Sequence, residues 1–543
     1  MLRTISSIGG LAFVLVGCGT DPYAGESSGT WTPTSTTTGT STGIIIATDY
    51  SVTVAPLRKL DLVFMIDNSP GMAGKLAKMT SQFSRLLSAL KDPSDGTYPD
   101  LRIAIIDSDL GTGGAYTSGS CGPSYSNDQS QYGDLGNFQT RGATSCGLTS
   151  AESLWLEYTK GIAVNYLGDI TSVFSCLATN TGTVGCGEEH SLQAFEFALV
   201  AQNLHVGQYA NQSGFLRSEA YLGLVFLTDE DDCSAGTNDG MFGDKAELLG
   251  ESASLRCATR GHRCDGFNLA DLGPGYPTTA AFTTDFIHCA ARTDSCPNTA
   301  DGKGSTDTSI PTPCSPLKSV ASIASELKAL KDADEKILVA GIFGWPRKGS
   351  DGNPDFTGAQ YRIDRVPNPN SADTAHPEVY DYWPVCYDPD HLPKSSGFEA
   401  EAWGYGAMGG LRLSSFVDAF GTSGLKYSIC ERDFSDAMQG IGGALARKMA
   451  NRCVSSSIDA KACTAHVMHP TADGTRTVTY VADAASTPKC AEVGAPVIRD
   501  CYTVVSDPTL CPGAQYVIQL NRTEAEIAAG PLDAGTKLRL SCK

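Results

Sequence analysis

Short apolar runs alternate with segments of helical periodicity through most of this chain of 543 residues. An apolar run of about four to eight residues between turn signals is typical of a strand buried on both faces. We therefore expect strands at Leu60–Ile66, Leu101–Ile106, Tyr221–Leu227 and Lys336–Phe343. This alternation predicts an α/β fold with a doubly wound, mainly parallel sheet.

Apolar residues at steps of three and four mark the buried face of a helix. After Gly71 the chain carries Leu76, Met79, Phe83, Leu86 and Leu90 at this spacing. The same pattern predicts helices at Ser191–Gln202, Pro316–Lys331 and Phe434–Met449. Pro316 suits a first helical turn, because its missing N–H has no partner to lose there.

Two long insertions interrupt the α/β pattern, at about residues 110–186 and 233–314. Each is rich in Gly, Ser, Thr and Asn, and a compact domain seldom holds loops of this length without cross-links. Disulfides would supply those cross-links. Both insertions follow expected strands, so we expect them to surround the carboxyl edge of the sheet.

The α/β domain is expected over residues 57–452, and residues 453–543 are expected to form a separate small β-rich domain. Leu538 and Leu540 alternate with Lys537 and Arg539, which is the pattern of a half-buried strand. Six cysteines in this region would make up for a small core.

Residues 1–18 have the pattern of a secretory signal, with an apolar core too short to span a bilayer. This segment ends in Leu15-Val16-Gly17-Cys18, which resembles a bacterial lipobox. We expect Cys18 to be acylated, by palmitate among other chains, and to anchor the protein. Gly19, in place of an aspartate, favours the outer membrane. Residues 19–50 are rich in Thr and Ser and predict a disordered or extended tether.

The chain has 19 cysteines, and lipidation of Cys18 would leave 18, an even number suited to disulfides in an oxidising compartment. Zinc binding would instead call for Cys-x2-Cys pairs, and the sequence has none. Even numbers within each region predict local pairing. The groups are Cys121, Cys146, Cys176 and Cys186; Cys233, Cys257, Cys264, Cys289, Cys296 and Cys314; Cys386 and Cys430; and Cys453, Cys463, Cys490, Cys501, Cys511 and Cys542.

The formal net charge is −20, with 60 acidic and 40 basic residues. Nucleic-acid binding needs clustered Lys and Arg against phosphates, so we expect no nucleic-acid partner. Acidity of this size is compatible with solubility outside the cell and with cation binding.

Residues with oxygen atoms in their side chains follow two of the expected strands. Asp67 and Ser69 come directly after the first, and Asp229 comes directly after the strand at Tyr221–Leu227. Ligands of parallel sheets collect outside the carboxyl ends of the strands. Carboxylate and hydroxyl oxygens are hard ligands, so these residues predict a site for Mg²⁺ or Ca²⁺.

These residues resemble the metal-ion-dependent adhesion site of the von Willebrand factor type A family, whose first motif is Asp-x-Ser-x-Ser. Asp67 and Ser69 match it, and Gly71 stands where the second serine would be. Asp229 matches the aspartate of the family's Thr-Asp-Gly motif. The family's middle threonine falls on Glu189, so the resemblance implies a degenerate site with one added carboxylate.

The lipobox, the Thr-rich tether, Asp61–Ser69, Ser108–Gly114 and Thr228–Ser234 together resemble the Cys-rich von Willebrand type A lipoproteins of myxobacteria and their relatives. The resemblance implies an envelope-anchored, non-enzymatic adhesion or ligand-binding protein. Its partner would be an unknown protein or glycan that offers a carboxylate to the bound cation.

Other interpretations remain open at this stage. The acids after Thr228 would be a solvated loop, and Glu189 would only charge the first turn of a helix. Glu188, Glu189 and His190 could act as acid and base, although no serine elbow between strand and helix and no His-Glu-x-x-His helix supports a hydrolase. Cys463, His466 and His469 mimic a zinc cluster, with exposed histidines as the simpler interpretation. The main alternative function is a structural or scaffolding lipoprotein without ligand capture.

Overall fold

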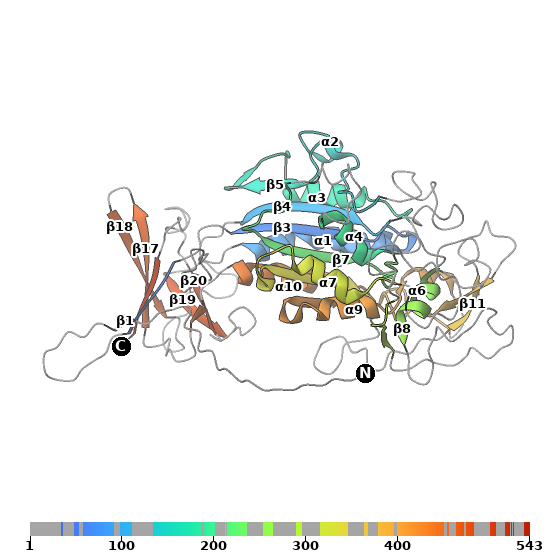
Figure 1. Cartoon of the computed structure of the whole chain (residues 1–543). Coiled ribbons are helices and arrows are strands. Elements are labelled where there is room, and N and C mark those ends of the chain that lie inside the picture. The colour runs from blue at the N-terminus through green and yellow to red at the C-terminus, as the bar shows by residue number, and fades with distance from the viewer. Residues whose placement is uncertain are drawn as a thin grey trace, which may run out of the picture.

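A computed structural model gives the arrangement of the chain (Figure 1). The residues it describes are 34–35, 48–53, 58–91, 98–110, 134–185, 189–200, 212, 214–235, 253–263, 289–295, 315, 317–345, 363–367, 378–395, 399–449, 453–454, 463–471, 474–482, 500–506, 516–521, 523, 525 and 537–542.

In this described part, seven strands form a central sheet in the order β15-β10-β7-β3-β4-β5-β6. The strands from β15 to β4 are parallel, and β5 and β6 complete one edge in antiparallel pairing. The mostly parallel sheet predicted from the apolar runs is confirmed. The strands are β3 (Lys59–Ile66), β4 (Asp100–Asp107), β5 (Leu156–Thr159), β6 (Ile162–Ala163), β7 (Tyr221–Leu227), β10 (Ile337–Phe343) and β15 (Gly424–Ser428).

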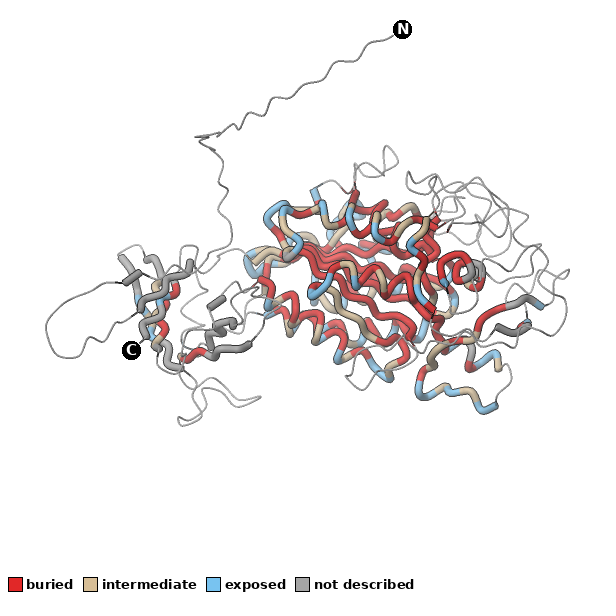
Figure 2. Tube along the Cα trace, turned by 60° about the horizontal axis from the view of Figure 1, so that its bottom comes forward, coloured by how far each residue is buried: buried red, intermediate tan, exposed pale blue. Residues whose placement is uncertain are grey.

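Helices cover both faces of the sheet, which explains why β3 is apolar at most positions; the exception inside the strand, Asp61, is buried and paired with Arg217 at 2.8 Å. Successive side chains of a strand point to opposite faces. Phe64 and Ile66 pack in one buried cluster with α1 (Ala73–Leu90), α3 (Ile170–Thr179) and α10 (Ser435–Met449). Val63 and Met65 pack in a second cluster with α4 (Ser191–Leu199), α7 (Val320–Lys328) and α9 (Leu411–Asp418). Figure 2 shows the buried strands in red between these layers.

The helix ends differ in detail from the predicted ones. The helix expected from Pro316 begins instead at Val320, because Ser319 caps it by accepting a hydrogen bond from the Ser322 N–H at 3.3 Å. The helix expected to reach Gln202 ends at Leu199. The helix predicted at Phe434–Met449 begins one residue later, at Ser435, and ends at Met449 as predicted.

The structure describes three disulfides, and each joins members of one predicted group. They are Cys146–Cys176, Cys233–Cys257 and Cys386–Cys430. Cys289 and Cys501 are also disulfide-bonded. The first two bridges lie in the two predicted insertions, and the third is the expected isolated pair.

A second sheet of eight described strands has the order β1-β2-β21-β17-β18-β19-β20-β16. Two of its strands come from near the N-terminus, and β2 pairs antiparallel with β21. Part of the segment expected to be a tether is therefore in regular structure. The strands are β1 (Thr34–Ser35), β2 (Thr48–Thr53), β16 (Cys453–Val454), β17 (Cys463–Thr471), β18 (Gly474–Ala482), β19 (Cys501–Ser506), β20 (Tyr516–Asn521) and β21 (Lys537–Cys542).

The described part of the chain also contains short helices and two-stranded pairs. They are η1 (Pro70–Met72), α2 (Ala143–Cys146), α6 (Ala253–Gly261), α8 (Ala400–Gly404), η6 (Asp334–Lys336), η7 (Gly421–Ser423) and the pairs β8 (His262–Arg263) with β9 (Ala290–Ala291), β11 (Ile363–Pro367) with β12 (Glu378–Tyr382), and β13 (Cys386–Tyr387) with β14 (Gly406–Ala407). Across the described ranges, no helix combines the length and the apolar character needed to cross a membrane.

Candidate functional site

The topology of the sheet places the predicted site. From β3 the chain builds β4, β5 and β6 on one side and then β7, β10 and β15 on the other. The boundary between β3 and β7 is thus the point where the winding direction changes, and such points hold the ligand crevice of open α/β sheets. Ile66 and Leu227 are paired at the carboxyl ends of these strands, so Asp67 and Asp229 emerge side by side.

Asp67 is fully buried and anchored on both carboxylate oxygens. The Ser69 backbone N–H donates to Oδ1 at 2.7 Å, and the Thr228 hydroxyl donates to Oδ2 at 2.7 Å. Burial and the neighbouring charge of Asp229 raise the pKa of Asp67 to about 7, against the opposing effect of these hydrogen bonds. Ser69 is also buried beside it.

Asp229 is nine-tenths buried, and only one of its two carboxylate oxygens has a partner among the described residues. Oδ2 forms an ion pair with the ammonium of Lys75, which comes from the first turn of α1. The same ammonium donates to the carbonyl of Gly406 at 2.7 Å. Oδ1 has no hydrogen-bond partner among the described residues.

Gly71 occupies the position of the missing serine, and the structure gives a reason for its small size. A Cβ at this residue would lie 2.6 Å from Asp229 Oδ2. Any larger residue would therefore have to displace the Asp229 carboxylate, which is held by Lys75. The ammonium of Lys75 was not predicted at this site, because the spacing of apolar residues in α1 indicates only the buried face of the helix.

Glu189 lies just before α4 and points into the same region. Its Oε2 accepts a hydrogen bond from the Ser108 hydroxyl, and its Oε1 has no partner in the described part of the chain. Burial, followed by the charges of Asp67, Glu230 and Asp229, holds the pKa of Glu189 well above its usual range. The carboxylate thus faces the other acids and does not simply charge the first turn of the helix.

Four predicted residues, Asp67, Ser69, Glu189 and Asp229, are therefore brought together at one edge of the sheet. Glu230 directly follows Asp229, is half-buried and accepts a hydrogen bond from the Ser254 hydroxyl at 2.5 Å. Burial and the charge of Asp229 hold the pKa of Glu230 well above its usual range. The run of acids after Thr228 was the signal that could have identified Glu230.

Cys18 lies outside the described residues, so its acylation stays a prediction.

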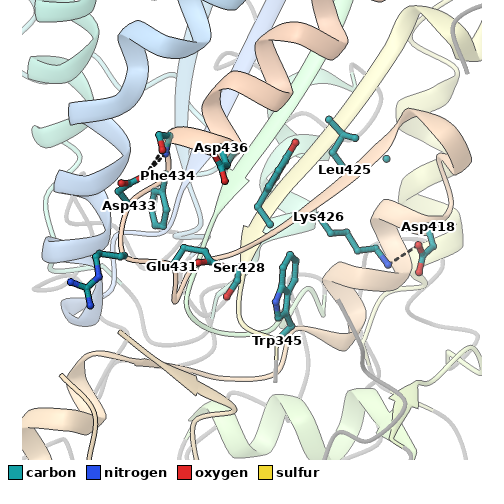
Figure 3. Close-up of a pocket in the computed structure, with 14 residues that line it drawn as sticks. Trp345, Asp418, Leu425, Lys426, Ser428, Glu431, Asp433, Phe434 and Asp436 are labelled. Carbon is teal, nitrogen blue, oxygen red and sulfur yellow. Dashed lines mark hydrogen bonds and ion pairs between the residues drawn. The ribbon is translucent and has the colours of Figure 1, made fainter. Parts of the chain in front are cut away.

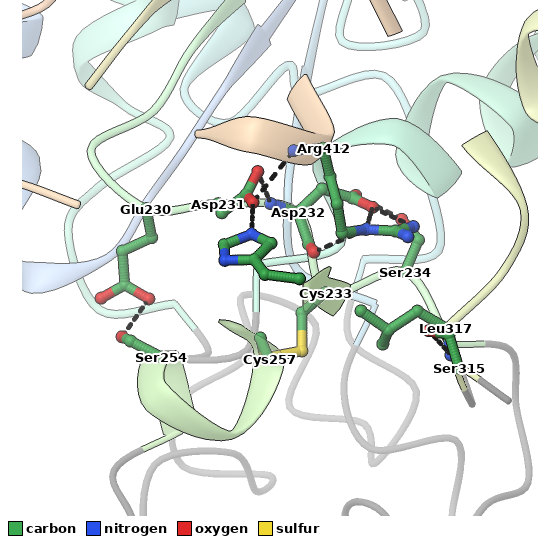
Figure 4. Close-up of a disulfide and its surroundings, with 11 residues drawn as sticks. Glu230, Asp231, Asp232, Cys233, Ser234, Ser254, Cys257, Ser315, Leu317 and Arg412 are labelled. Carbon is green, nitrogen blue, oxygen red and sulfur yellow. Dashed lines mark hydrogen bonds and ion pairs between the residues drawn. A yellow bond between two sulfur atoms is a disulfide. The ribbon is translucent and has the colours of Figure 1, made fainter. Parts of the chain in front are cut away.

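The remaining acids of the run have structural partners (Figure 4). Asp231 accepts hydrogen bonds from the N–H groups of Arg412 and Leu413, at the N-terminus of α9, and from His262. Asp232 receives the guanidinium of Arg412 at 2.9 Å and the Leu192 N–H of α4 at 3.0 Å. The interpretation as a solvated loop is therefore wrong: both carboxylates are buried and compensated by helix N-termini and bases.

A second group of acids follows β4. Burial and the charges of Asp134 and Asp109 hold the pKa of Asp107 well above its usual range. The Asn68 side chain donates to Asp107 Oδ2 at 3.4 Å and so links this group to the site. Within the described ranges, no three His, Cys, Asp or Glu side chains are arranged to hold one metal ion. A cation at this edge would depend on hydroxyl, carbonyl or water oxygens as well.

His466, from the apparent zinc cluster, lies in β17 of the second sheet. Its ring nitrogens are 3.1 Å from the Thr479 hydroxyl and 3.3 Å from the Thr464 hydroxyl. Both ring nitrogens of His466 are therefore within hydrogen-bond distance of threonine hydroxyls of β17 and β18.

No protein-family model matches this sequence. No match was found among curated proteins. Among solved structures the chain is similar to the pilus adhesin SpaC of Lactobacillus rhamnosus GG, with 9% identity, a TM-score of 0.28, and coverage of 94% of this chain and 43% of SpaC. The human COPII-coat protein Sec24c shows 9% identity and a TM-score of 0.25, over 91% of this chain and 46% of Sec24c. The adhesive tip pilin GBS104 of Group B Streptococcus agalactiae shows 12% identity and a TM-score of 0.19, over 95% and 85%.

The chain thus spans less than half the length of SpaC and of Sec24c. With TM-scores this low, none of these proteins supplies a function for the chain.

Proposed function

We propose that this protein is a non-enzymatic adhesion or ligand-binding protein of the cell envelope, built on a von Willebrand type A domain. Its site would hold Mg²⁺ or Ca²⁺ at the junction of β3 and β7. A carboxylate of a partner protein or glycan would complete the coordination of the cation. Acylation of Cys18 would anchor the protein, and we favour the outer membrane.

One observation carries this proposal. Asp229 Oδ1 and Glu189 Oε1 are buried acceptors without a hydrogen-bond partner among the described residues, and they lie near the buried carboxyl of Asp67. A buried polar atom left without a partner costs about 1–3 kcal/mol, and more when it is charged. A cation would remove this cost and the mutual repulsion of the acids at the same time.

The donor set fits a hard cation in part. Since no three acids of the described residues are arranged around one ion, two of the carboxylates of Asp67, Asp229 and Glu189, together with the Ser69 hydroxyl, would provide the oxygens that Mg²⁺ and Ca²⁺ prefer. The cation would supply a positive charge able to bind an external carboxylate. Gly71 contributes no hydroxyl, so water would take that position. The protein's own part is to hold the acids in place, through the Ser69 N–H and the Thr228 hydroxyl.

Calorimetric titration of the chain with Mg²⁺ and with Ca²⁺ tests the cation site. Asp67→Asn keeps the shape of the side chain and weakens the ligand, so it should abolish most of the binding. Asp332→Asn is the matched control, because Asp332 is an exposed acid paired with Lys336. Absence of binding in the parent, or equal binding in Asp67→Asn, would remove the metal site.

Melting curves give an independent measurement. A cation that binds only the folded state stabilises it by roughly 2.7 kcal/mol at a hundredfold excess over Kd. The parent should melt higher with cation than with chelator. Asp67→Asn should lose this response, and its cation-free form should melt no lower than the cation-free parent, because the substitution removes repulsion.

A structural or scaffolding role is the second candidate, favoured by the ion pair between Lys75 and Asp229. A site that carries its own ammonium can be stable without ligand capture. The two candidates differ in binding to an immobilised acidic peptide. Adhesion requires that binding depends on Mg²⁺ or Ca²⁺ and is lost on chelation, whereas a scaffold would not bind the peptide under either condition.

A further inference from the structure

A groove lies at the opposite edge of the sheet from β6, along β15. Its cavity has a volume of about 680 Å³ (Figure 3). It is lined by Trp345 after β10, by Gly424–Ser428 of β15, and by residues 431–437, which lead into α10. Pockets of roughly 300–1,000 Å³ are typical of ligand sites. The groove is separate from the acids after β3 and β7.

The strand in this groove has a free side. In the described part of the chain, β15 pairs with β10 and with no other strand. Gly424–Tyr427 are half-buried, whereas β10 is buried throughout. Alternate residues of an edge strand direct N–H and C=O groups away from the sheet, where a further strand can bind them.

Both faces of β15 are already covered by helices. Tyr427 packs toward α10, where a Cβ at Gly440 would lie 2.1 Å from its hydroxyl oxygen. Lys426 turns to the other face, where its ammonium is 2.6 Å from Asp418 and 2.7 Å from the Ser414 hydroxyl, both in α9. Lysines on edge strands commonly prevent pairing with a strand of another chain. The Lys426 side chain is held by α9, so it does not block the edge of β15.

The groove carries a surplus of negative charge. Its lining holds four carboxylates, Asp418, Glu431, Asp433 and Asp436, and two bases, Lys426 and Arg432. Both bases are paired, Lys426 with Asp418 and Arg432 with Asp390. Asp433 and Asp436 are exposed at the start of α10. A basic partner is therefore favoured over an acidic one.

We infer that the groove along β15 binds an extended, basic segment of a partner protein, which adds to the central sheet as a further strand. Backbone hydrogen bonds to β15 hold the segment, as in other cases of strand addition. Asp436 and its acidic neighbours select the charge of its side chains. This binding is independent of the proposed cation site.

The probe for this inference is a fluorescent octapeptide of alternating Lys and Val, titrated into the whole chain in the presence of chelator and followed by anisotropy. Two matched peptides separate the contributions. In one, Glu replaces Lys; in the other, alternate backbone nitrogens are methylated. Each should bind at least about tenfold more weakly, equivalent to roughly 1.4 kcal/mol. Binding of the parent peptide should weaken as salt rises.

A charge-reversed variant locates the site. Asp436→Lys should weaken binding of the Lys–Val peptide by about tenfold. Glu152→Lys is the control, because it makes the same change of charge at an exposed position outside the groove. Hydrogen exchange on the parent gives a reading that needs no variant: bound peptide should slow exchange of amides within Gly424–Ser428.

Several results would overturn the inference. The first is that the Lys–Val peptide does not bind saturably at millimolar concentration. The second is that N-methylation does not change the affinity of the peptide. The third is that Asp436→Lys and Glu152→Lys weaken peptide binding equally. Self-association of the chain that Asp436→Lys abolishes would assign the groove to a second copy instead. Peptide binding lost on chelation would place it at the cation site. Failure here leaves the calorimetric test of the cation site unaffected.

Discussion

Lys75, in the first turn of α1, forms a buried ion pair with Asp229, which follows β7 and lies 154 residues later in the chain. The same ammonium is held by the carbonyl of Gly406. The ammonium of Lys75 therefore contacts the same carboxylate that we propose as a ligand of the cation. Two cations at one carboxylate repel each other, so Lys75 and a divalent ion should compete for Asp229.

Lys75→Met should therefore raise the affinity for Mg²⁺ or Ca²⁺ by about tenfold, roughly 1.4 kcal/mol. The variant removes the ammonium and keeps most of the apolar stem. Lys78→Met is the matched control, since Lys78 lies one turn later and pairs with Asp388 instead of Asp229. Calorimetric titration measures both. Weaker cation binding in Lys75→Met than in Lys78→Met would show that Lys75 supports the ion.

The buried acids predict how stability depends on pH. The pKa of Asp67 is raised to about 7, and those of Glu189 and Glu230 are raised in the same direction. Between the unfolded pKa of about 4 and the folded pKa, the folded state binds more protons than the unfolded state, so stability falls as pH rises. Without cation, the free energy of unfolding should be lower at pH 8 than at pH 5.

Urea unfolding at the two pH values, with chelator present, measures this difference. Acids with lowered pKa values, such as Asp388 and Asp294, titrate below this window and do not contribute to it. Asp67→Asn should show a smaller difference between pH 5 and pH 8, since one of the titrating groups is gone. A parent that is equally stable at both values would contradict the burial of these carboxyls.

Arg412 and Asp232 form a buried ion pair at 2.9 Å, and both side chains are almost fully covered. Removal of one partner leaves a buried charge uncompensated, which typically costs about 3–5 kcal/mol. Arg412→Met should lose stability of this size in urea unfolding. The double variant with Asp232→Asn should lose clearly less than the sum of the single losses. Additive losses would show that the two side chains do not act as a pair.

Anchoring is tested by Cys18→Ser. If Cys18 is acylated, the variant should appear in the soluble fraction or remain unprocessed, because no acyl chain holds it to the membrane. Ser7→Ala, within the same N-terminal segment, should partition as the parent does. The measurement is detergent phase partitioning followed by immunoblotting. Unchanged partitioning of Cys18→Ser would refute the assignment of the lipobox.

Local patterns were sufficient for the strands at the centre of the sheet. Leu60–Ile66 was expected and Lys59–Ile66 is found, because a strand covered on both faces is apolar at nearly every position. The buried Asp61 is the exception, and it pairs with Arg217. The edge strand β15 was not anticipated. Its residues are half-buried and include Lys426, so neither a continuous apolar run nor a clear alternation marks it.

The sequence by itself determined which residues follow the carboxyl ends of the strands, and with them Asp67, Ser69 and Asp229 as the candidate site. The even cysteine groups also predicted that Cys386 would pair with Cys430, and the structure confirms this bridge. Only the tertiary structure decided which charges meet there. Lys75 reaches Asp229 and Arg412 reaches Asp232 across separations of 154 and 180 residues. Such contacts depend on the order of strands in the sheet and on the helices packed against it, and no periodicity within a single segment encodes that order.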